Sequence, residues 1–126
     1  AGKCLDLPAW SNDTPAMIRI CNSPLSAAQT WTYHPLAQTF TVDSPSGPKC
    51  LDATSTPNFG MLAVINDCTG AASQRWVLDY ETKSITNVNT GWVLDLNGGG
   101  TAEGTLVGLM SYVEGDTAQQ WVWSLD

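Results

Sequence analysis

The chain has 126 residues, of which 43% are hydrophobic and 13% charged, which suits one ordinary core and not a disordered polyelectrolyte. A formal net charge of -7 argues against nucleic acids and anionic membranes as partners, because their phosphates would be repelled. The single histidine, His34, excludes a multi-histidine zinc site, and no stretch approaches the ~18 apolar residues of a membrane span. We therefore expect no metal, no cofactor and no membrane insertion.

Short apolar segments alternate with turns along the whole chain, and most show the two-residue alternation of half-buried strands. The best helical candidate, Ser26 to Gln29, is only one turn long. Runs such as Ser44 to Pro48 and Asn97 to Gly100 have the composition of turns. The predicted strand segments, in chain order, are Met17 to Ile20, Trp31 to Tyr33, Thr39 to Asp43, Met61 to Ile65, Trp76 to Leu78, Lys83 to Val88, Leu106 to Met110 and Trp121 to Leu125.

A Gln-x-Trp triplet occurs three times, at intervals of 45 residues. Upstream of each triplet stands a Leu-Asp pair, and an apolar run lies between the pair and the triplet. Three equally spaced triplets, each with the same upstream pair, predict three structural repeats. The triplets begin at Gln29, Gln74 and Gln119, and the pairs end at Asp6, Asp52 and Asp95.

Three repeats of about four short strands can close a barrel with a cap of hairpins, which removes most open strand edges. We expect one all-β domain over residues 1–126, with repeats of about 45 residues at 1–38, 39–82 and 83–126. The triplet tryptophans should pack inward, and each triplet glutamine should bond the backbone of its own repeat. Only three residues precede Cys4, so we expect the first repeat to lack its first strand. That edge would then be left bare or be covered by another chain.

Four cysteines are spaced in two similar intervals of 17 and 18 residues. This spacing favours two disulfides, Cys4–Cys21 and Cys50–Cys68, over four unpaired thiols, which is the alternative. Disulfides indicate an oxidising compartment, so we expect a secreted or extracellular protein.

The Gln-x-Trp triplets, the Cys-Leu-Asp pairs and the cysteine spacing together resemble the ricin B-type lectins, including β-trefoil carbohydrate-binding modules attached to xylanases. The resemblance implies a β-trefoil fold, sugar binding at up to three shallow sites, and no catalysis by the domain. It also implies a site design in which the Asp accepts sugar hydroxyls and an aromatic ring, two residues before the second cysteine, stacks on the sugar. An Asn before the triplet glutamine, and sometimes that glutamine, adds polar contacts.

The sequence departs from this design at the stacking position, which holds Arg19, then Asn66, then Met110 or Ser111. The position before each glutamine holds Ala28, Ser73 and Ala118 instead of Asn. In the third repeat Val93 and Tyr112 stand where the disulfide would be, and an apolar pair can fill that space.

Other loop residues could supply the missing contacts. Trp10, and less strongly Phe59, could act as the apolar platform; the alternative is a ring folded over the hairpin cap. We rank the first repeat ahead of the second, and the third last, because Tyr112 is expected to point inward. Each Asp could instead cap its own loop, and each glutamine could be structural. The candidate sugar-binding residues are Asp6, Trp10, Arg19, Gln29, Asp52, Phe59, Asn66, Gln74, Asp95, Asn97 and Gln119.

The sequence therefore predicts a non-catalytic lectin or module that binds neutral glycans, of galactose type or from cell walls. One alternative is a trefoil used as a protein-interaction or inhibitor scaffold whose sugar sites are lost. A small glycosidase that uses acidic residues such as Glu103, Glu114 and Asp116 is less favoured. The expected partners are oligo- or polysaccharides, together with a linked catalytic domain or another chain at the N-terminal edge.

Overall fold

The computed structural model describes residues 3–53 and 61–123, which form short antiparallel strands and single helical turns. Three sheets hold the strands in the orders β1-β3, β2-β7-β6-β5-β4 and β11-β10-β9-β8. None of the helical turns in these ranges is long and apolar enough to cross a membrane. The strands are β1 (Lys3–Asp6), β2 (Thr14–Pro15), β3 (Met17–Ile20), β4 (Trp31–His34), β5 (Thr39–Ser44), β6 (Gly47–Ala53), β7 (Ala63–Asp67), β8 (Trp76–Asp79), β9 (Ser84–Asn87), β10 (Val93–Leu96) and β11 (Val107–Met110).

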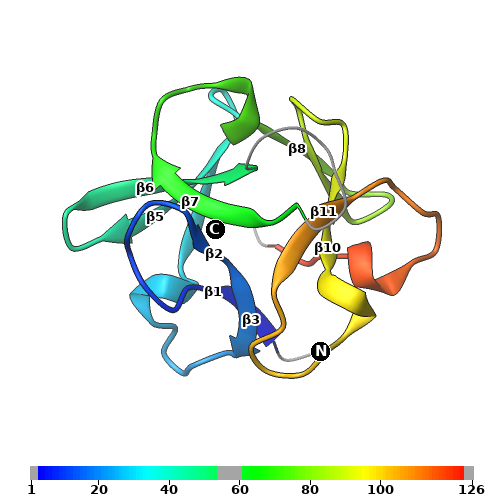
Figure 1. The fold of residues 1–126 in the computed structure, drawn as a ribbon, viewed down its shortest axis with the longest axis horizontal. Helices are drawn as coiled ribbons and strands as arrows, with labels where there is room; N and C mark the ends of the chain where they lie inside the picture. Colours follow the sequence, from blue (N-terminus) through cyan, green and yellow to red (C-terminus); the bar gives the residue numbers. More distant parts are fainter. Residues whose placement is uncertain (1–2, 54–60, 124–126) are drawn as a thin grey trace.

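The three predicted repeats lie around a common centre, as Figure 1 shows from blue through green to red. The Leu-Asp pairs end β1 or lie within β6 and β10, and each of these strands pairs with the following apolar strand, β3, β7 or β11. A helical turn then leads into each Gln-x-Trp triplet: η1 (Ala27–Gln29), η2 (Ala72–Gln74) and η4 (Thr117–Gln119). This arrangement is the β-trefoil that the sequence predicted.

The triplet tryptophans anchor the repeats to the shared core. In each repeat the indole Nε1 donates to the carbonyl oxygen of the leucine in that repeat's Leu-Asp pair, at 3.0, 3.0 and 3.1 Å. Trp76 is fully buried, and Trp31 and Trp121 pack against the same cluster. Replacing a buried tryptophan with alanine typically costs about 3–5 kcal/mol. The prediction that these rings pack inward is therefore confirmed.

Both predicted disulfides are present, Cys4–Cys21 and Cys50–Cys68, each with a Cα–Cα distance of 5.1 Å. At the corresponding place in the third repeat, Val93 is buried, but the side chain of Tyr112 is 43% exposed. The expectation that Tyr112 points inward is therefore wrong. Val93 alone completes the strand pairing there, opposite Met110, and the larger ring remains at the surface.

The last predicted strand is not formed over residues 121–123, and residues 124–126 lie outside the described part of the chain. The backbone N–H of Trp121 donates to the carbonyl oxygen of Lys83 at 2.8 Å, as that of Trp76 donates to Gln38 at 2.7 Å. The strand at Trp76 also pairs along its other edge with β9. For residues 121–123 no such second ladder occurs within the described ranges, so the segment is extended without strand pairing.

Candidate functional site

Each repeat contains the same hydrogen-bonded pair, between the Asp after the leucine and the triplet glutamine. The glutamine Nε2 donates to an Asp Oδ2 at 2.8 Å in the first repeat, 3.1 Å in the second and 2.9 Å in the third. The same Nε2 also donates to a backbone carbonyl oxygen upstream in its repeat. The glutamine Oε1 accepts from the backbone N–H of the residue two positions after that carbonyl. All the usual partners of the amide are therefore within its own repeat, as predicted. The glutamine thus fixes the orientation of the carboxylate through Oδ2. The repeats differ in the surroundings of the other oxygen, Oδ1.

In the first repeat both carboxylate oxygens are used internally. Asp6 Oδ1 accepts from the backbone N–H of Leu7 at 2.7 Å, and Oδ2 accepts from Gln29. The residue is only 5% exposed, and Met17 lies across the strand from it. Trp10 is half-buried against the core, whereas Arg19 is exposed. The structure thus brings Asp6 and Gln29 together, with Asp6 capping its own loop.

In the second repeat the side chain at the stacking position, Asn66, forms a hydrogen bond with the carboxylate of Asp52. Asn66 Nδ2 donates to Asp52 Oδ2 at 3.1 Å, the same oxygen that Gln74 reaches. Asn66 Oδ1 in turn accepts from the backbone N–H of Asp13, in a loop of the first repeat, at 3.0 Å. Asp52 is 8% exposed and lies opposite Val64. Its Oδ1 is buried and has no hydrogen-bond partner within the described residues. Phe59, the predicted platform here, lies outside those residues.

A polar latch, made of Lys49, Asn12 and Asp67, holds the first-repeat loop against the second repeat. Lys49 Nζ donates to Asn12 Oδ1 at 2.7 Å and forms an ion pair with Asp67 Oδ1 at 2.8 Å. Asn12 Nδ2 donates to Asp67 Oδ2 at 3.2 Å. The hydrogen bond from Lys49 lowers the pKa of Asp67 below its usual range, and the bond from Asn12 and the charge of Lys49 act in the same direction. This latch holds the loop in the position from which the Asp13 backbone N–H donates to Asn66 Oδ1.

In the third repeat the carboxylate is open. Asp95 Oδ2 accepts from Gln119, and no other hydrogen bond to Asp95 occurs among the described residues. Asp95 is half-buried, and across the strand from it lies Gly108, which has no side chain. Burial raises the pKa of Asp95, the Gln119 hydrogen bond lowers it by less, and the negative charge of Asp116 raises it further. Oδ1 is thus an acceptor for which the described residues supply no donor.

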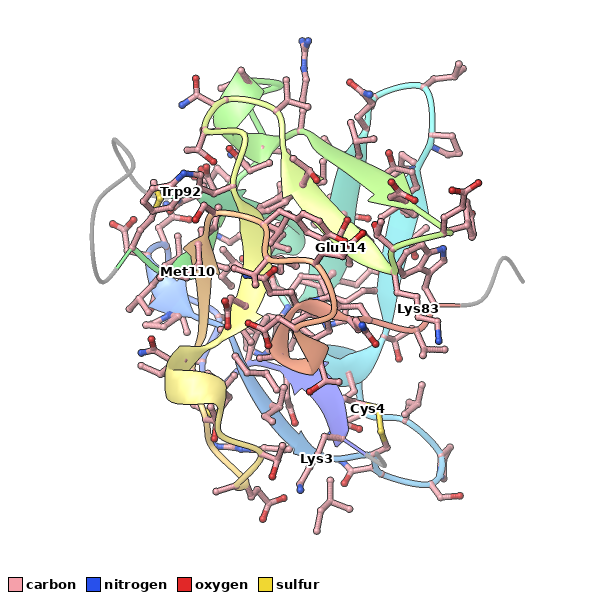
Figure 2. The ribbon with its side chains drawn as sticks, turned by 90° about the vertical axis from the view of Figure 1, so that its right-hand side faces the viewer. Lys3, Cys4, Lys83, Trp92, Met110 and Glu114 are labelled. Carbon is pink, nitrogen blue, oxygen red and sulfur yellow. A yellow bond between two sulfur atoms is a disulfide. The ribbon has the colours of Figure 1, made fainter. Side chains whose placement is uncertain are left out.

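Two exposed residues flank this strand pair: Asn97 directly follows β10, and Met110 ends β11 opposite Val93. Figure 2 shows Met110 on the face turned toward the viewer. Met110 holds the stacking position, and the residue is 36% exposed. A methionine is soft and apolar and can lie against the C–H face of a sugar, although it lacks the ring of the family design. Sequence reasoning ranked this repeat last.

Two further residues affect Asp95 and were not predicted from the sequence to do so: Gly108, which lies opposite it, and Asp116, whose charge acts on it. A Cβ on Gly108 would lie 2.8 Å from the carbonyl oxygen of Met61, so the backbone of the second repeat approaches it closely. The one signal in the sequence was a glycine inside the apolar run Leu106 to Met110. Within the described residues, no group of three His, Cys, Asp or Glu side chains could hold a metal ion.

The three Asp–Gln pairs on a β-trefoil define a lectin-like domain. The family model for the ricin-type β-trefoil lectin domain matches residues 1–121. The chain therefore belongs to the ricin-type β-trefoil lectin domain family, and this membership supports carbohydrate binding. No curated protein matches the sequence.

Several solved structures share the fold. A designed three-fold symmetric protein, ThreeFoil, is 23% identical with a TM-score of 0.79, and the match covers 95% of this chain and 89% of that one. An agglutinin from Abrus precatorius is 25% identical with a TM-score of 0.70, over 88% of this chain and 40% of that one. The Vibrio vulnificus hemolysin/cytolysin β-trefoil lectin, solved with N-acetyl-D-lactosamine bound, is 16% identical with a TM-score of 0.63, over 98% and 84%. The chain thus spans less than half the length of the agglutinin.

Proposed function

We propose that this domain is a non-catalytic lectin or carbohydrate-binding module for neutral glycans, and that its third repeat carries the principal site. The observation behind this proposal is the open carboxylate of Asp95. Asp6 accepts from the chain on both oxygens, whereas Asp52 accepts twice on Oδ2 and its Oδ1 is buried without a partner among the described residues; the two residues are only 5% and 8% exposed. Asp95 keeps an oxygen for a sugar hydroxyl, with Gln119 fixing its orientation.

The physics of the site suits a neutral sugar better than an acidic one. A carboxylate accepts charge-assisted hydrogen bonds from hydroxyl groups, which are stronger than bonds between neutral partners. Asp116 adds a second negative charge near Asp95, which would repel a uronic or sialic acid. The galactose-type or cell-wall glycans expected from the sequence carry no such charge. A single shallow site binds weakly, so avidity from several sites or from a linked domain would be needed.

The first-repeat site, built on Asp6, Trp10 and Arg19, remains a prediction of the sequence, and we place it behind the third. The exposed Arg19 is free to donate to a sugar, but Asp6 has no free oxygen at the surface. In the second repeat Asn66 takes the place on Asp52 that a sugar hydroxyl would occupy. We interpret that repeat as a structural support.

The same closed carboxylates favour the competing function, a trefoil scaffold for protein interaction or inhibition. None of the three stacking positions carries an aromatic ring. We keep the glycosidase as a third and less favoured possibility. The two disulfides are consistent with a secreted, extracellular protein. A linked catalytic domain, or another chain at the N-terminal edge, is the protein partner we expect.

A glycan array of the intact chain, run beside a hydrolysis assay on the glycans that bind, tests these functions. The lectin proposal expects binding of neutral glycans without turnover, and loss of that binding in Asp95→Asn. Turnover would identify a glycosidase. Absence of both binding and turnover across the array would contradict the lectin proposal and favour the scaffold.

A further inference from the structure

A hollow in the third repeat lies apart from the Asp95 carboxylate. It has a volume of about 350 Å³ and opens between the turn that joins β8 to β9 and the loop that follows β11. The turn contributes Glu81 and Lys83, and the loop contributes Tyr112, Glu114 and Gln120. Figure 2 shows Lys83 and Glu114 on the face turned toward the viewer. We call this feature the Tyr112 hollow.

The corresponding place in the second repeat is occupied by different contacts. The hydrogen bonds of the triplet glutamines align Thr69 with Val113, and therefore Cys68 with Tyr112. Cys68 is tied back by its disulfide, and Arg75 Nε donates to the carbonyl oxygen of Gly70 at 3.1 Å, across the corresponding place. In the third repeat a free ring replaces the disulfide, and Gln120 replaces the arginine.

The side chains around the hollow have the chemistry of a sugar site. Tyr112 is 43% exposed, and its ring offers a surface for the C–H face of a pyranose. Glu81 and Glu114 are exposed, and no ion pair joins either to Lys83 within the described residues, where the ion pair observed is Lys49–Asp67. The carboxylates are thus free to accept from hydroxyls, while Lys83 and the Gln120 amide can donate.

The charge of the hollow selects among sugars. Two carboxylates and one ammonium leave one net negative charge on a chain whose net charge is -7. This charge disfavours sialylated or uronic sugars. Its open shape suits one or two residues of a chain at the surface rather than an enclosed cofactor.

We propose that the Tyr112 hollow is an additional glycan-binding site, for a neutral pyranose, separate from the site at Asp95. Adjacent residues divide the two sites, because Gln119 turns inward to Asp95 and Gln120 lines the hollow. The class of ligand, a neutral glycan, rests on the proposed function. The location of the site rests on the residues that line the hollow. Two sites on one repeat allow a multivalent glycan to bind with avidity.

The test is an NMR titration of the ¹⁵N-labelled chain with lactose and with xylotetraose, two neutral probes, and with 3′-sialyllactose as the charged counterpart of lactose. We expect the amides of Gly115 and Gln120 to shift saturably with a neutral probe in the wild type and in Asp95→Asn. Tyr112→Ala should weaken that response about tenfold, while Tyr112→Phe retains it. Glu114→Gln should weaken it as well, and 3′-sialyllactose should bind the hollow several-fold more weakly than lactose.

Three results would overturn the inference, and they are distinguishable. If a neutral probe shifts only amides near Asp95 and Gly108, the hollow is not a site, although the proposed function stands. If neither neutral probe shifts any amide, the proposed function fails for these sugars and the hollow fails with it. If Tyr112→Ala keeps its fold and the Gly115 response is unchanged, the ring is not the platform.

Discussion

The second and third repeats carry the same Asp–Gln pair on equivalent strands, yet Asp52 is buried and bonded by Asn66, whereas Asp95 is half-buried and its carboxylate is open. In the second repeat Asn66 bonds Asp52 and is itself held by the loop of the first repeat, which the Lys49 latch fixes. In the third repeat Gly108 lies opposite Asp95, and no amide takes the place of Asn66. The Asp–Gln motif alone therefore defines the scaffold, and the side chains opposite the Asp decide whether a ligand can reach it.

The largest difference in stability between these repeats should come from the disulfide, which the third repeat lacks. We expect the double substitution Cys50→Ser with Cys68→Ser to lower the free energy of unfolding by roughly 3 kcal/mol, because an 18-residue loop is released in the unfolded chain. Chemical denaturation measures this loss. A loss well below 1 kcal/mol would show that the second repeat does not depend on its cross-link.

The contact between the two repeats at Gly108 should tolerate no side chain. Gly108→Ala would place a methyl 2.8 Å from the Met61 carbonyl oxygen, so a strand must shift at a cost of about 1–3 kcal/mol. Gly100→Ala is the matched control, since its Cβ would meet Thr105 at an ordinary 3.5 Å. Equal melting temperatures for the two variants would contradict this account of the interface.

The closed and open carboxylates should respond differently to the same isosteric change. Asp6→Asn sets an NH₂ group against either the Leu7 N–H or the Gln29 amide, at a cost of about 1–3 kcal/mol. Asp95→Asn can keep its oxygen on Gln119 and turn its NH₂ outward, so it should fold with undiminished stability at neutral pH. Denaturant unfolding of both variants decides this. Comparable losses would mean that Asp95 is also internally satisfied.

The smallest expected effect is the pH dependence of Asp95. Its pKa is raised in the folded protein, so the carboxyl contributes stability below its ordinary pKa, and this contribution is lost as pH rises through the folded pKa. The stability of Asp95→Asn relative to wild type should therefore increase as pH rises from about 3 to 7. Asp79, whose pKa is lowered by backbone hydrogen bonds from Thr82 and Glu81, should give the opposite slope in Asp79→Asn. Slopes of the same sign would contradict one of the two assignments, and a falling slope for Asp95→Asn would contradict the raised pKa of Asp95.

Most of the fold was predictable because the three tryptophans and the glutamines use local, repeated contacts. The indole bonds of Trp31, Trp76 and Trp121, and the two disulfides, follow from motifs that recur at fixed spacing. The extended segment at 121–123 was not predictable from its own pattern, since strand pairing depends on a neighbouring strand.

The choice of site was harder to predict, because it depends on contacts between repeats. Nothing in the sequence places Asp13 on Asn66, or the Met61 carbonyl on Gly108. The exposure of Tyr112 also escaped prediction, since Val93 pairs with Met110 and leaves the ring without a place in the core. An aromatic residue at a cysteine position was expected to pack in the core, but Tyr112 lies at the surface.

The central claim is that the open carboxylate of the third repeat binds the sugar. Titration calorimetry of wild type, Asp95→Asn and Trp10→Ala, with the best neutral glycan from the array, tests it most directly. We expect Asp95→Asn to lose about 1.5–3 kcal/mol of affinity, the value of a hydrogen bond to a charged group, and Trp10→Ala to bind as wild type does. Unchanged affinity in Asp95→Asn together with a loss in Trp10→Ala would move the site to the first repeat and contradict the account.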